Sequence, residues 1–303
     1  MGQVLVLGSI NMDLITYVDN IPALGETVTG GRFQSFPGGK GANQAVAAAK
    51  AGGRVAMYGC VGDDALGQEC INNLEKAGID VGRVIIKNGV HTGIAQIMVD
   101  ARGENIIAVA PGANFLFDAS EFVIPEQAGE ERVIALFQNE IPQKTTEAMI
   151  QGFGGCGITM LWNTAPACIR KPSIKTLELV NYLICNRIEL RSLVGEGKDD
   201  TLALKLCNWG VKNVIVTMGK QGALLVAGEE VYYQPAFSVT PVDTVGAGDC
   251  FCGVFAWALS MGESAKLALR KASAAAALSI TMKGAQTSMP TAGQIDTFLL
   301  SNS

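Results

Sequence analysis

The stretch DTVGAGD, residues 243–249, places two carboxylates and two glycines in seven residues and runs directly into an apolar pattern with helical spacing. Glycines at 246 and 248 leave backbone N–H groups uncovered at the start of that helix, where the helix dipole adds to their attraction for an anion. Such a turn could hold a phosphate, or the negative charge that develops on a phosphoryl group during its transfer. The residue types therefore indicate phosphate chemistry at this junction.

Asp249 stands at the mouth of the same helix, and two interpretations of it are open. A carboxylate next to an anion site repels the anion unless it has a task, and accepting a proton from an attacking hydroxyl is such a task. An Asp at the start of a helix is also a common helix cap. Asp249 is thus either a general base or a cap, and the residue alone does not decide.

A second glycine-rich turn, FPGGKGANQAVAAAKAG at 36–52, also leads into a helix. It differs from a P-loop because Lys40 is followed by Gly41, and because Gln34 stands where the first P-loop glycine belongs. Neither glycine turn carries the third glycine of a dinucleotide fingerprint. Bare backbone with Lys40 and Asn43 as donors suits a substrate with several hydroxyls.

A third candidate is the stretch GSINMDL, residues 8–14, at the end of the first apolar strand pattern. Strand alternation puts Asn11 and Asp13 on one face, and an amide beside a carboxylate is a usual means of binding a vicinal diol. Asn and Asp are also frequent in turns for purely local reasons. Both interpretations remain open for this pair.

The elements that must position these residues alternate along the chain. Apolar strand patterns occupy 3–8, 55–62, 133–138, 158–163, 182–186, 214–219 and 222–227, and helical patterns include 42–52, 67–78 and 200–210. Strands that are apolar throughout and alternate with helices predict an α/β fold with a central, mostly parallel sheet and helices on both faces. In such a fold, ligands bind at the carboxyl ends of the strands.

Residues 14–36 and 91–109 interrupt this alternation with short, strand-like patterns. We expect the two segments to form one small β-sheet that acts as a lid over the strand ends. Ordinary edge strands of the main sheet are the alternative. With either outcome, 1–303 is expected to be a single α/β domain, with the lid inserted in it.

Composition narrows the class of partner. The net charge is −5 and like charges do not cluster, so we expect neither nucleic acid nor a membrane as partner, but a small molecule. The eight cysteines are scattered singly, which favours reduced thiols and a cytoplasmic location over a disulfide framework. With His91 as the only histidine, a zinc site is not expected.

Taken together, these motifs resemble the ribokinase family of carbohydrate kinases. The resemblance covers nearly the whole chain, through GSINMD, LGETVTG (24–30), GGKGANQAVAAA (38–49), VGDDALG (61–67), DTVGAGD and KGAQTSMP (283–290). Two glycine-rich signatures in this order, about 200 residues apart, are highly specific.

The resemblance implies a role for each matching position. Asp249 matches the catalytic base, and Gly246, Ala247 and Gly248 match the anion hole for the transferred phosphoryl group. Sugar-binding positions are Asn11, Asp13, Gly39, Lys40, Asn43 and Glu140. Asn186 and Glu189 match an Asn-x-x-Glu motif that organises Mg²⁺ around the phosphates of ATP. Thr217, Gly219 and Gly222 match the nucleotide loop, and Asp243, Val245, Ser279, Met282, Gly284 and Ser288 match a monovalent-cation site, with K⁺ as the expected ion.

The implied activity is ATP-dependent phosphorylation of the primary hydroxyl of a pentose, D-ribose giving ribose 5-phosphate. The apolar residues Ile15 and Tyr17 at the lid entry keep other substrates open: 2-deoxyribose, fructose, a ketogluconate or an adenosine-like nucleoside. Arg187 inside the Asn-x-x-Glu motif, and Asn163 with Thr164 where Asn-Pro is commoner, depart from the family pattern. A non-catalytic sugar sensor is the least favoured reading, because Asp249 and the glycines of its turn are intact.

A homodimer is also expected, formed through the small sheet. A sheet with an exposed apolar face tends to be covered by another surface.

Overall fold

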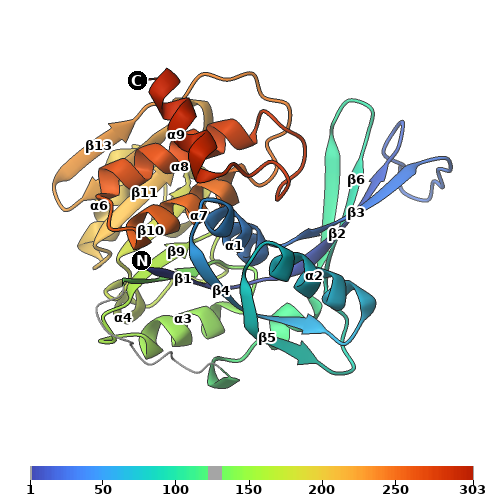
Figure 1. Ribbon diagram of the computed structural model, residues 1–303, viewed down its shortest axis with the longest axis horizontal. Helices are drawn as coiled ribbons and strands as arrows, with labels where there is room; N and C mark the ends of the chain where they lie inside the picture. The colour runs from blue at the N-terminus through green and yellow to red at the C-terminus, as the bar shows by residue number, and fades with distance from the viewer. Residues whose placement is uncertain (1, 122–131, 303) are drawn as a thin grey trace.

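The computed structural model describes residues 2–121 and 132–302 and has a large α/β body with a smaller sheet beside it (Figure 1). Nine strands form the main sheet in the order β13-β12-β11-β10-β9-β8-β1-β4-β5. Their bounds are β1 Gln3–Leu7, β4 Arg54–Gly62, β5 Asp80–Lys87, β8 Val133–Phe137, β9 Thr159–Asn163, β10 Tyr182–Asn186, β11 Asn213–Thr217, β12 Ala223–Ala227 and β13 Glu230–Gln234. The predicted α/β fold with a mostly parallel sheet is confirmed.

Alternate residues of the central strands enter two separate hydrophobic cores. In β1, Val4 and Val6 face one core, while Leu5 and Leu7 face the other, and all four are buried. Because side chains alternate across a strand, a strand covered on both faces must be apolar at every position. This is the physical reason that the strand pattern in the sequence is continuous and not alternating.

Helices cover both faces of the sheet (Figure 1). The core of Val4 and Val6 is closed by α1 Lys40–Lys50, α2 Ala65–Lys76, α7 Ala247–Ser260, α8 Ala265–Ser279 and α9 Ala292–Ser301. The core of Leu5 and Leu7 is closed by α3 Gln143–Gly152, α4 Ile174–Leu177, α5 Arg187–Val194 and α6 Asp199–Asn208. Short 3₁₀ turns lie at Gly112–Leu116, Ala119–Glu121 and Gly219–Gln221. Among the described residues, no helix is long and apolar enough to cross a membrane.

The strand predictions need three corrections in detail. The strand at 222–227 is present as β12, but it pairs antiparallel with both β11 and β13. The edge strands β5 and β13 were not predicted, because their partly exposed positions lack the continuous apolar run of the central strands. The stretch 8–14 was expected at the end of the first strand, but β1 ends at Leu7. From Asn11 onward, this stretch forms the start of β2 in the smaller sheet.

The smaller sheet has the order β3-β2-β6-β7 and projects from the body (Figure 1). Its strands are β2 Asn11–Tyr17, β3 Arg32–Gly38, β6 Gly93–Val99 and β7 Asn105–Ala110. β2 pairs parallel with β6, so the two predicted β segments join in one sheet and are not edge strands of the main sheet. The strands reach a few residues beyond the expected 14–36 and 91–109 at their ends, and these extra residues include Asn11 and Asp13.

Candidate active site

The start of α1 packs directly on the segment that leads into β2. Gly39 has φ +88°, and a Cβ atom on it would lie 2.8 Å from the backbone nitrogen of Asn11. A Cβ on Gly41 would lie 2.7 Å from the backbone nitrogen and oxygen of Ser9. Glycine is required at both positions because backbone meets backbone without room for a side chain. This contact brings the predicted sugar-binding residues of α1 beside those of β2.

The start of α7 is also a glycine-rich turn that leads into a helix, but part of it faces open space. Gly246, with φ +75°, precedes the helix, and a Cβ on it would lie 2.8 Å from the Cβ of Ala285. Gly248 is exposed, and a Cβ on it would meet no described atom within 4 Å. The first-turn N–H groups of a helix have no partner inside the helix. An anion could therefore approach the backbone at Gly248 closely.

Asp249 is the third residue of α7, and its carboxylate does not cap the helix. Its two oxygens accept hydrogen bonds from α1: Oδ2 from Nδ2 of Asn43 at 3.1 Å, and Oδ1 from Nε2 of Gln44 at 3.0 Å. The Asp249 side chain is buried, and Gly246 is the N-cap residue. The cap interpretation is therefore wrong in this structure. The carboxylate is instead held as an acceptor beside the open turn.

Gln44, which the sequence analysis did not single out, is the centre of a buried amide cluster. Its Nε2 donates to Oδ1 of Asn163 at 3.1 Å as well as to Asp249, and its Oε1 accepts from Nε2 of Gln138 at 2.7 Å. All of these side chains are buried. A glutamine on the buried, alanine-rich face of α1 is the signal that would have identified it. Asn163, which precedes Thr164 where the family pattern has Asn-Pro, serves here as the partner of Gln44.

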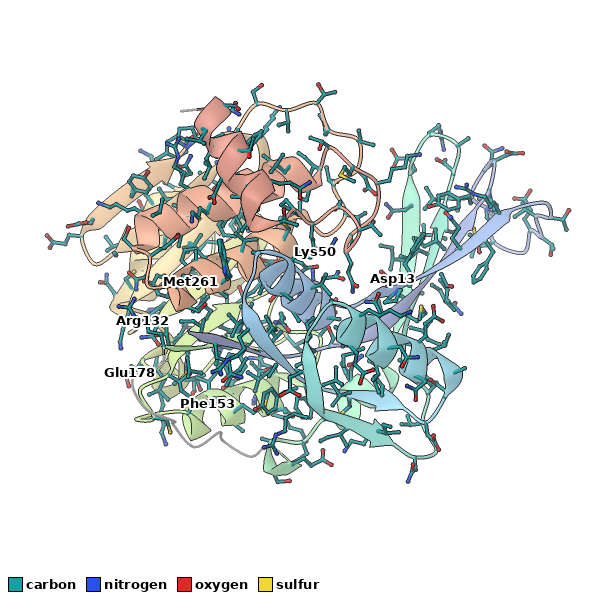
Figure 2. All side chains as sticks on the ribbon, viewed as in Figure 1. Asp13, Lys50, Arg132, Phe153, Glu178 and Met261 are labelled. Carbon is teal, nitrogen blue, oxygen red and sulfur yellow. The ribbon has the colours of Figure 1, made fainter. Side chains whose placement is uncertain are left out.

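Lys40, Glu140 and Asp13 gather around Asp249. The Asp249 carboxylate raises the pKa of Lys40, and burial opposes this less strongly. Burial, together with the nearby carboxylates of Glu140 and Asp249, raises the pKa of Asp13 to about 7. One cation among three carboxylates leaves an excess of acceptors, which is suited to binding hydroxyl groups. Figure 2 shows Asp13 where the small sheet joins the body.

The other predicted sugar-binding positions are fixed by local hydrogen bonds. Glu140 accepts from the Ser9 hydroxyl at 2.6 Å and from the backbone N–H of Lys40 at 2.9 Å. Oδ1 of Asn11 accepts from Nδ2 of Asn114 at 2.7 Å, and this fixes which end of the Asn11 amide is the donor. Asn114 is buried and also bonds the backbone of residue 10, a role that only tertiary contact reveals.

Asn186 and Glu189 form a reciprocal capping box at the start of α5. The Asn186 side chain accepts from the backbone N–H of Glu189 at 2.9 Å, while Glu189 accepts from the backbone N–H and the Nδ2 of Asn186, both at 2.8 Å. Burial raises the pKa of Glu189. Both of its oxygens already accept a hydrogen bond, but each carboxylate oxygen has a second lone pair. The pair can therefore contact magnesium through water.

Arg187 is directed away from the capping box. Its Nε donates to Oδ2 of Asp199 at 2.6 Å, and a terminal nitrogen lies 3.3 Å from the sulfur of Met218. The ion pair with α6 explains how an arginine fits inside the motif without disturbing its two outer positions.

The predicted nucleotide loop follows β11, next to the capping box. Thr217, the last residue of β11, is in register with Asn186 of β10. Gly219 and Gly222 flank the short turn to β12, and Gly219 is exposed. The carboxyl ends of two neighbouring parallel strands thus carry both groups of residues that the resemblance assigns to ATP.

The residues assigned to a monovalent cation come from two segments that Asp243 joins. Its Oδ1 accepts from the backbone N–H of Val245 at 3.0 Å, and its Oδ2 accepts from that of Gly284 at 2.9 Å. We call residues 283–290 the C-terminal loop. The remaining members are Ser279 at the end of α8, Met282 just before this loop, and Ser288 within it, whose hydroxyl donates to the carbonyl of residue 285 at 2.9 Å.

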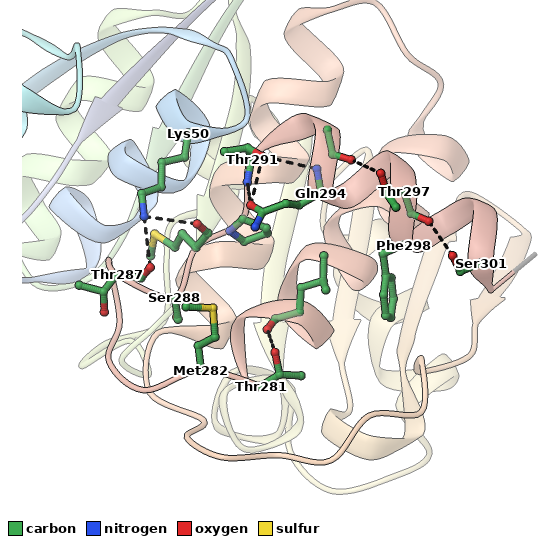
Figure 3. Close-up of a pocket in the computed structure, with 14 residues that line it drawn as sticks. Lys50, Thr281, Met282, Thr287, Ser288, Thr291, Gln294, Thr297, Phe298 and Ser301 are labelled. Atoms are coloured by element: carbon green, nitrogen blue, oxygen red, sulfur yellow. Dashed lines mark hydrogen bonds between the residues drawn. The ribbon is translucent and has the colours of Figure 1, made fainter.

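A cavity of about 860 Å³ lies against the C-terminal loop, the end of α8 and α9 (Figure 3). Of the predicted site residues, its lining includes Met282 and Ser288 and none of the Asp249 cluster. It therefore shares a wall with the predicted cation site and is separate from the side chains around Asp249. Among the described residues, no group of three or more His, Cys, Asp or Glu side chains could hold a metal ion.

Comparisons with known proteins show the family of this chain. The model of the pfkB family carbohydrate kinases matches residues 1–292. Ribokinase of Bacillus subtilis strain 168 is 38% identical over 299 residues, 99% of this chain and 100% of the relative. Deoxyribokinase of Salmonella typhi is 36% identical over 305 residues, 99% of each chain. The solved structure of Arabidopsis thaliana ribokinase complexed with ribose and ATP is 30% identical, has a TM-score of 0.87 and covers 98% of both chains.

The family match spans residues 1–292 of the 303 in the chain. This chain belongs to the pfkB family of carbohydrate kinases.

Proposed function

We propose that this protein transfers the γ-phosphoryl group of ATP to the primary hydroxyl of D-ribose, giving ribose 5-phosphate. The observation that carries the proposal is the position of Asp249, buried next to the open backbone at Gly248 and held by two amides of α1. Full-length similarity to a ribokinase supports the choice of ribose.

In the proposed reaction, Asp249 accepts the proton of the attacking hydroxyl. The two amide donors orient the carboxylate, since each donates a hydrogen bond to one of its oxygens. A positioned base contributes about 10²- to 10⁴-fold in rate. Asn11, Asp13, Gly39, Lys40, Asn43 and Glu140 bind and orient the sugar hydroxyls.

The start of α7 stabilises the phosphoryl group during transfer. The turn of Gly246, Ala247 and Gly248 lies at the N-terminal end of α7, where the helix dipole favours negative charge. Phosphoryl transfer depends on positioning and charge compensation more than on covalent help from the protein. Lys40 adds a positive charge on the sugar side, because it lies close enough to Asp249 to be stabilised by it.

ATP is proposed to bind over the carboxyl ends of β10 and β11, on Thr217, Gly219 and Gly222. Magnesium, when bound with ATP, neutralises charge on the phosphates. Asn186 and Glu189 would hold it through water molecules, since the capping box fixes both side chains and leaves a lone pair on each Glu189 oxygen.

The cation site is proposed to take K⁺, through oxygens of the following residues. They are Asp243, Val245, Ser279, Met282, Gly284 and Ser288. The hydrogen bonds from Asp243 to both segments support this, because an ion bound there would stiffen the turn before α7.

A second candidate substrate is 2-deoxyribose. It is favoured by one observation, the 36% identity to a deoxyribokinase over 99% of each chain. Fructose, a ketogluconate and a nucleoside remain in the test as further acceptors.

The test is ADP release from ATP and Mg²⁺ with D-ribose, 2-deoxyribose, fructose, a ketogluconate and adenosine, with and without K⁺. We expect the highest kcat/KM with D-ribose and a further increase with K⁺. A higher kcat/KM with 2-deoxyribose or adenosine would show that this compound, and not ribose, is the preferred substrate. If none of the five acceptors led to ADP release, the proposed function would be contradicted.

We also propose a homodimer formed through the small sheet. Large apolar side chains are exposed on it at Phe33, Phe36, Ile106, Ile107 and Val109. Light scattering is expected to give the mass of a dimer for the wild type. The variant Ile107→Glu should be monomeric, while Ile169→Glu, at an exposed residue of the body, should remain a dimer. A monomeric wild type would contradict this.

We propose a cytoplasmic location as well. All eight cysteines are free, which supports it.

A further inference from the structure

The C-terminal loop is attached to α1 at two points. Asn43 and Lys50 are seven residues apart and lie on one face of the helix. The Lys50 ammonium donates to the carbonyl oxygens of Gln286 at 2.7 Å and of Thr287 and Met289 at 3.3 Å (Figure 3 shows the bonds to the latter two). Nε2 of Gln286 donates to Oδ1 of Asn43 at 3.0 Å. The loop backbone is thus clamped while one of its side chains reaches toward the active site.

Three consecutive residues of the loop contact three different parts of the catalytic machinery. The N–H of Gly284 donates to Asp243, Ala285 packs against Gly246, and the side chain of the next residue, Gln286, reaches α1. The loop therefore contacts the predicted cation site, the anion turn and the partner of the base in sequence.

The side-chain amides form a relay whose direction is fixed at one end. Asn73 of α2 donates to Oε1 of Gln286 at 2.7 Å, Gln286 donates to Asn43, and Asn43 donates to Asp249. An ionised carboxylate only accepts hydrogen bonds, so Asn43 must turn its NH₂ group to Asp249. Its oxygen then faces Gln286, which must donate to it, and the oxygen of Gln286 must face a donor in turn.

We propose that Gln286 is a positioning residue for the kinase reaction: it holds Asn43 in the orientation that donates to Asp249, and so couples the C-terminal loop to the catalytic base. This inference rests on the proposed function, because it takes Asp249 as the base. An acceptor in place of the Gln286 donor would reverse Asn43 and direct its oxygen at the carboxylate.

The sharpest test reverses the relay from its far end. In Asn73→Asp, a carboxylate faces Gln286, which must turn its NH₂ group outward, and the reversal passes to Asn43. Asn72→Asp is the matched control: it adds the same charge on the same helix, at an exposed residue that already accepts from Gln68. A charge-assisted hydrogen bond that is lost corresponds to a rate effect of roughly 10- to 100-fold. We expect Asn73→Asp to lower kcat by about tenfold, and Asn72→Asp to leave it unchanged.

Gln286→Glu and Gln286→Met test the same point inside the relay. Glu has nearly the shape of Gln but cannot donate when ionised, so its kcat is expected to fall furthest, by up to about 100-fold. KM for ATP should be unchanged. The charged neighbours of Asp249, namely Lys40, Asp13, Glu140 and Glu189, are unaltered in these variants.

The outcomes separate this inference from the proposed function. Wild type that releases no ADP with any acceptor contradicts the proposed function. If wild type is active and the folded variants Asn73→Asp and Gln286→Glu keep its kcat, the positioning role is contradicted while the proposed function stands. Equal losses in Asn73→Asp and Asn72→Asp would show an effect of charge alone, and would also contradict the relay.

Discussion

The two glycine-rich junctions of this protein share a sequence signature but meet different physical demands. At the start of α1, glycine is needed because the backbone of 39–41 touches the backbone of 9–11. At the start of α7, Gly248 faces open space, and nothing in the described protein requires it to lack a side chain. Because Gly248 stands next to the buried Asp249 carboxylate, we explain its missing side chain by a ligand. The first junction therefore belongs to the architecture of the site, and the second to its chemistry.

The largest expected effect comes from the carboxylate at the open junction. Asp249→Asn should lower kcat by roughly 10² to 10⁴, because the variant cannot take up the proton of the sugar hydroxyl. ADP release at saturating ATP and ribose measures this, and isothermal titration of ribose should show that binding is kept. Turnover like that of wild type would remove Asp249 from the role of base, and with it the chemical reading of the open junction.

The packed junction is expected to lose stability when a methyl group is added. In Gly41→Ala the new Cβ would lie 2.7 Å from the backbone of Ser9, where no side chain can turn aside. We expect this overpacking to lower the free energy of unfolding by about 3 kcal/mol, the upper end of the usual effect, and to lower Tm by about 5 °C or more. Differential scanning calorimetry measures the change. A Tm equal to that of wild type would show that the contact is looser than described.

The open junction should respond to the same change in the opposite way. Gly248→Ala fills space that no described atom occupies, and Gly→Ala at a compatible helix position stabilises by about 0.4 to 1 kcal/mol. Its methyl group would obstruct an anion at the N–H groups of the turn, so kcat/KM for ATP should fall at least about tenfold.

Gly293→Ala is the matched control for this variant. Gly293 is likewise the second residue of its helix, α9, and also faces open space. It should gain similar stability without loss of activity. If Gly248→Ala is as active as Gly293→Ala, the open junction does not bind the phosphoryl group.

Much of this contrast was predictable from local sequence. The central strands are continuous apolar runs because both faces are covered, and the alternation that paired Asn11 with Asp13 is a local property of a strand. The glycine turns at 38–41 and 246–248 were recognisable for the same reason, since each is defined by neighbouring residues. The antiparallel pairing of β12 with β11 was not predictable in this way. The direction of a strand after a short connection depends on the neighbour with which it pairs.

The polar network around Asp249 could not be predicted from the sequence. Gln44, Gln138 and Asn163 come from positions more than 20 residues apart, and each looks like an ordinary residue in its own helix or strand. Gln286 lay inside a recognised motif, but its contact with α1 spans 243 residues. Orientation of amides depends on what they meet in space. This is why the residue types could suggest a role for Asp249, while the hydrogen bonds that hold it needed the structure.

The smallest expected effect is at the packed junction, where Asp13 lies against Gly38. There, a residue expected to bind the sugar also lowers the stability of the folded protein. Burial, together with Glu140 and Asp249, raises the pKa of Asp13 from 3.8 to about 7. The unfolded chain therefore loses this proton near pH 4 and the folded protein only near pH 7. Stability from the protonated form is complete below pH 4 and is lost as the pH rises to about 7.

Asp13→Asn removes this loss. At pH 7.5 it should raise the free energy of unfolding by about 0.5 to 2 kcal/mol, as is common when a strained site residue is relieved. The gain should vanish near pH 4, while KM for ribose rises about tenfold because an acceptor for its hydroxyls is gone. Asp19→Asn, at an exposed position just beyond β2, should change neither quantity. Thermal unfolding from pH 4 to 8 measures the difference. If the gain in Tm is the same at every pH, the pKa of Asp13 is not raised in the folded protein, and its carboxylate does not destabilise the packed junction near pH 7.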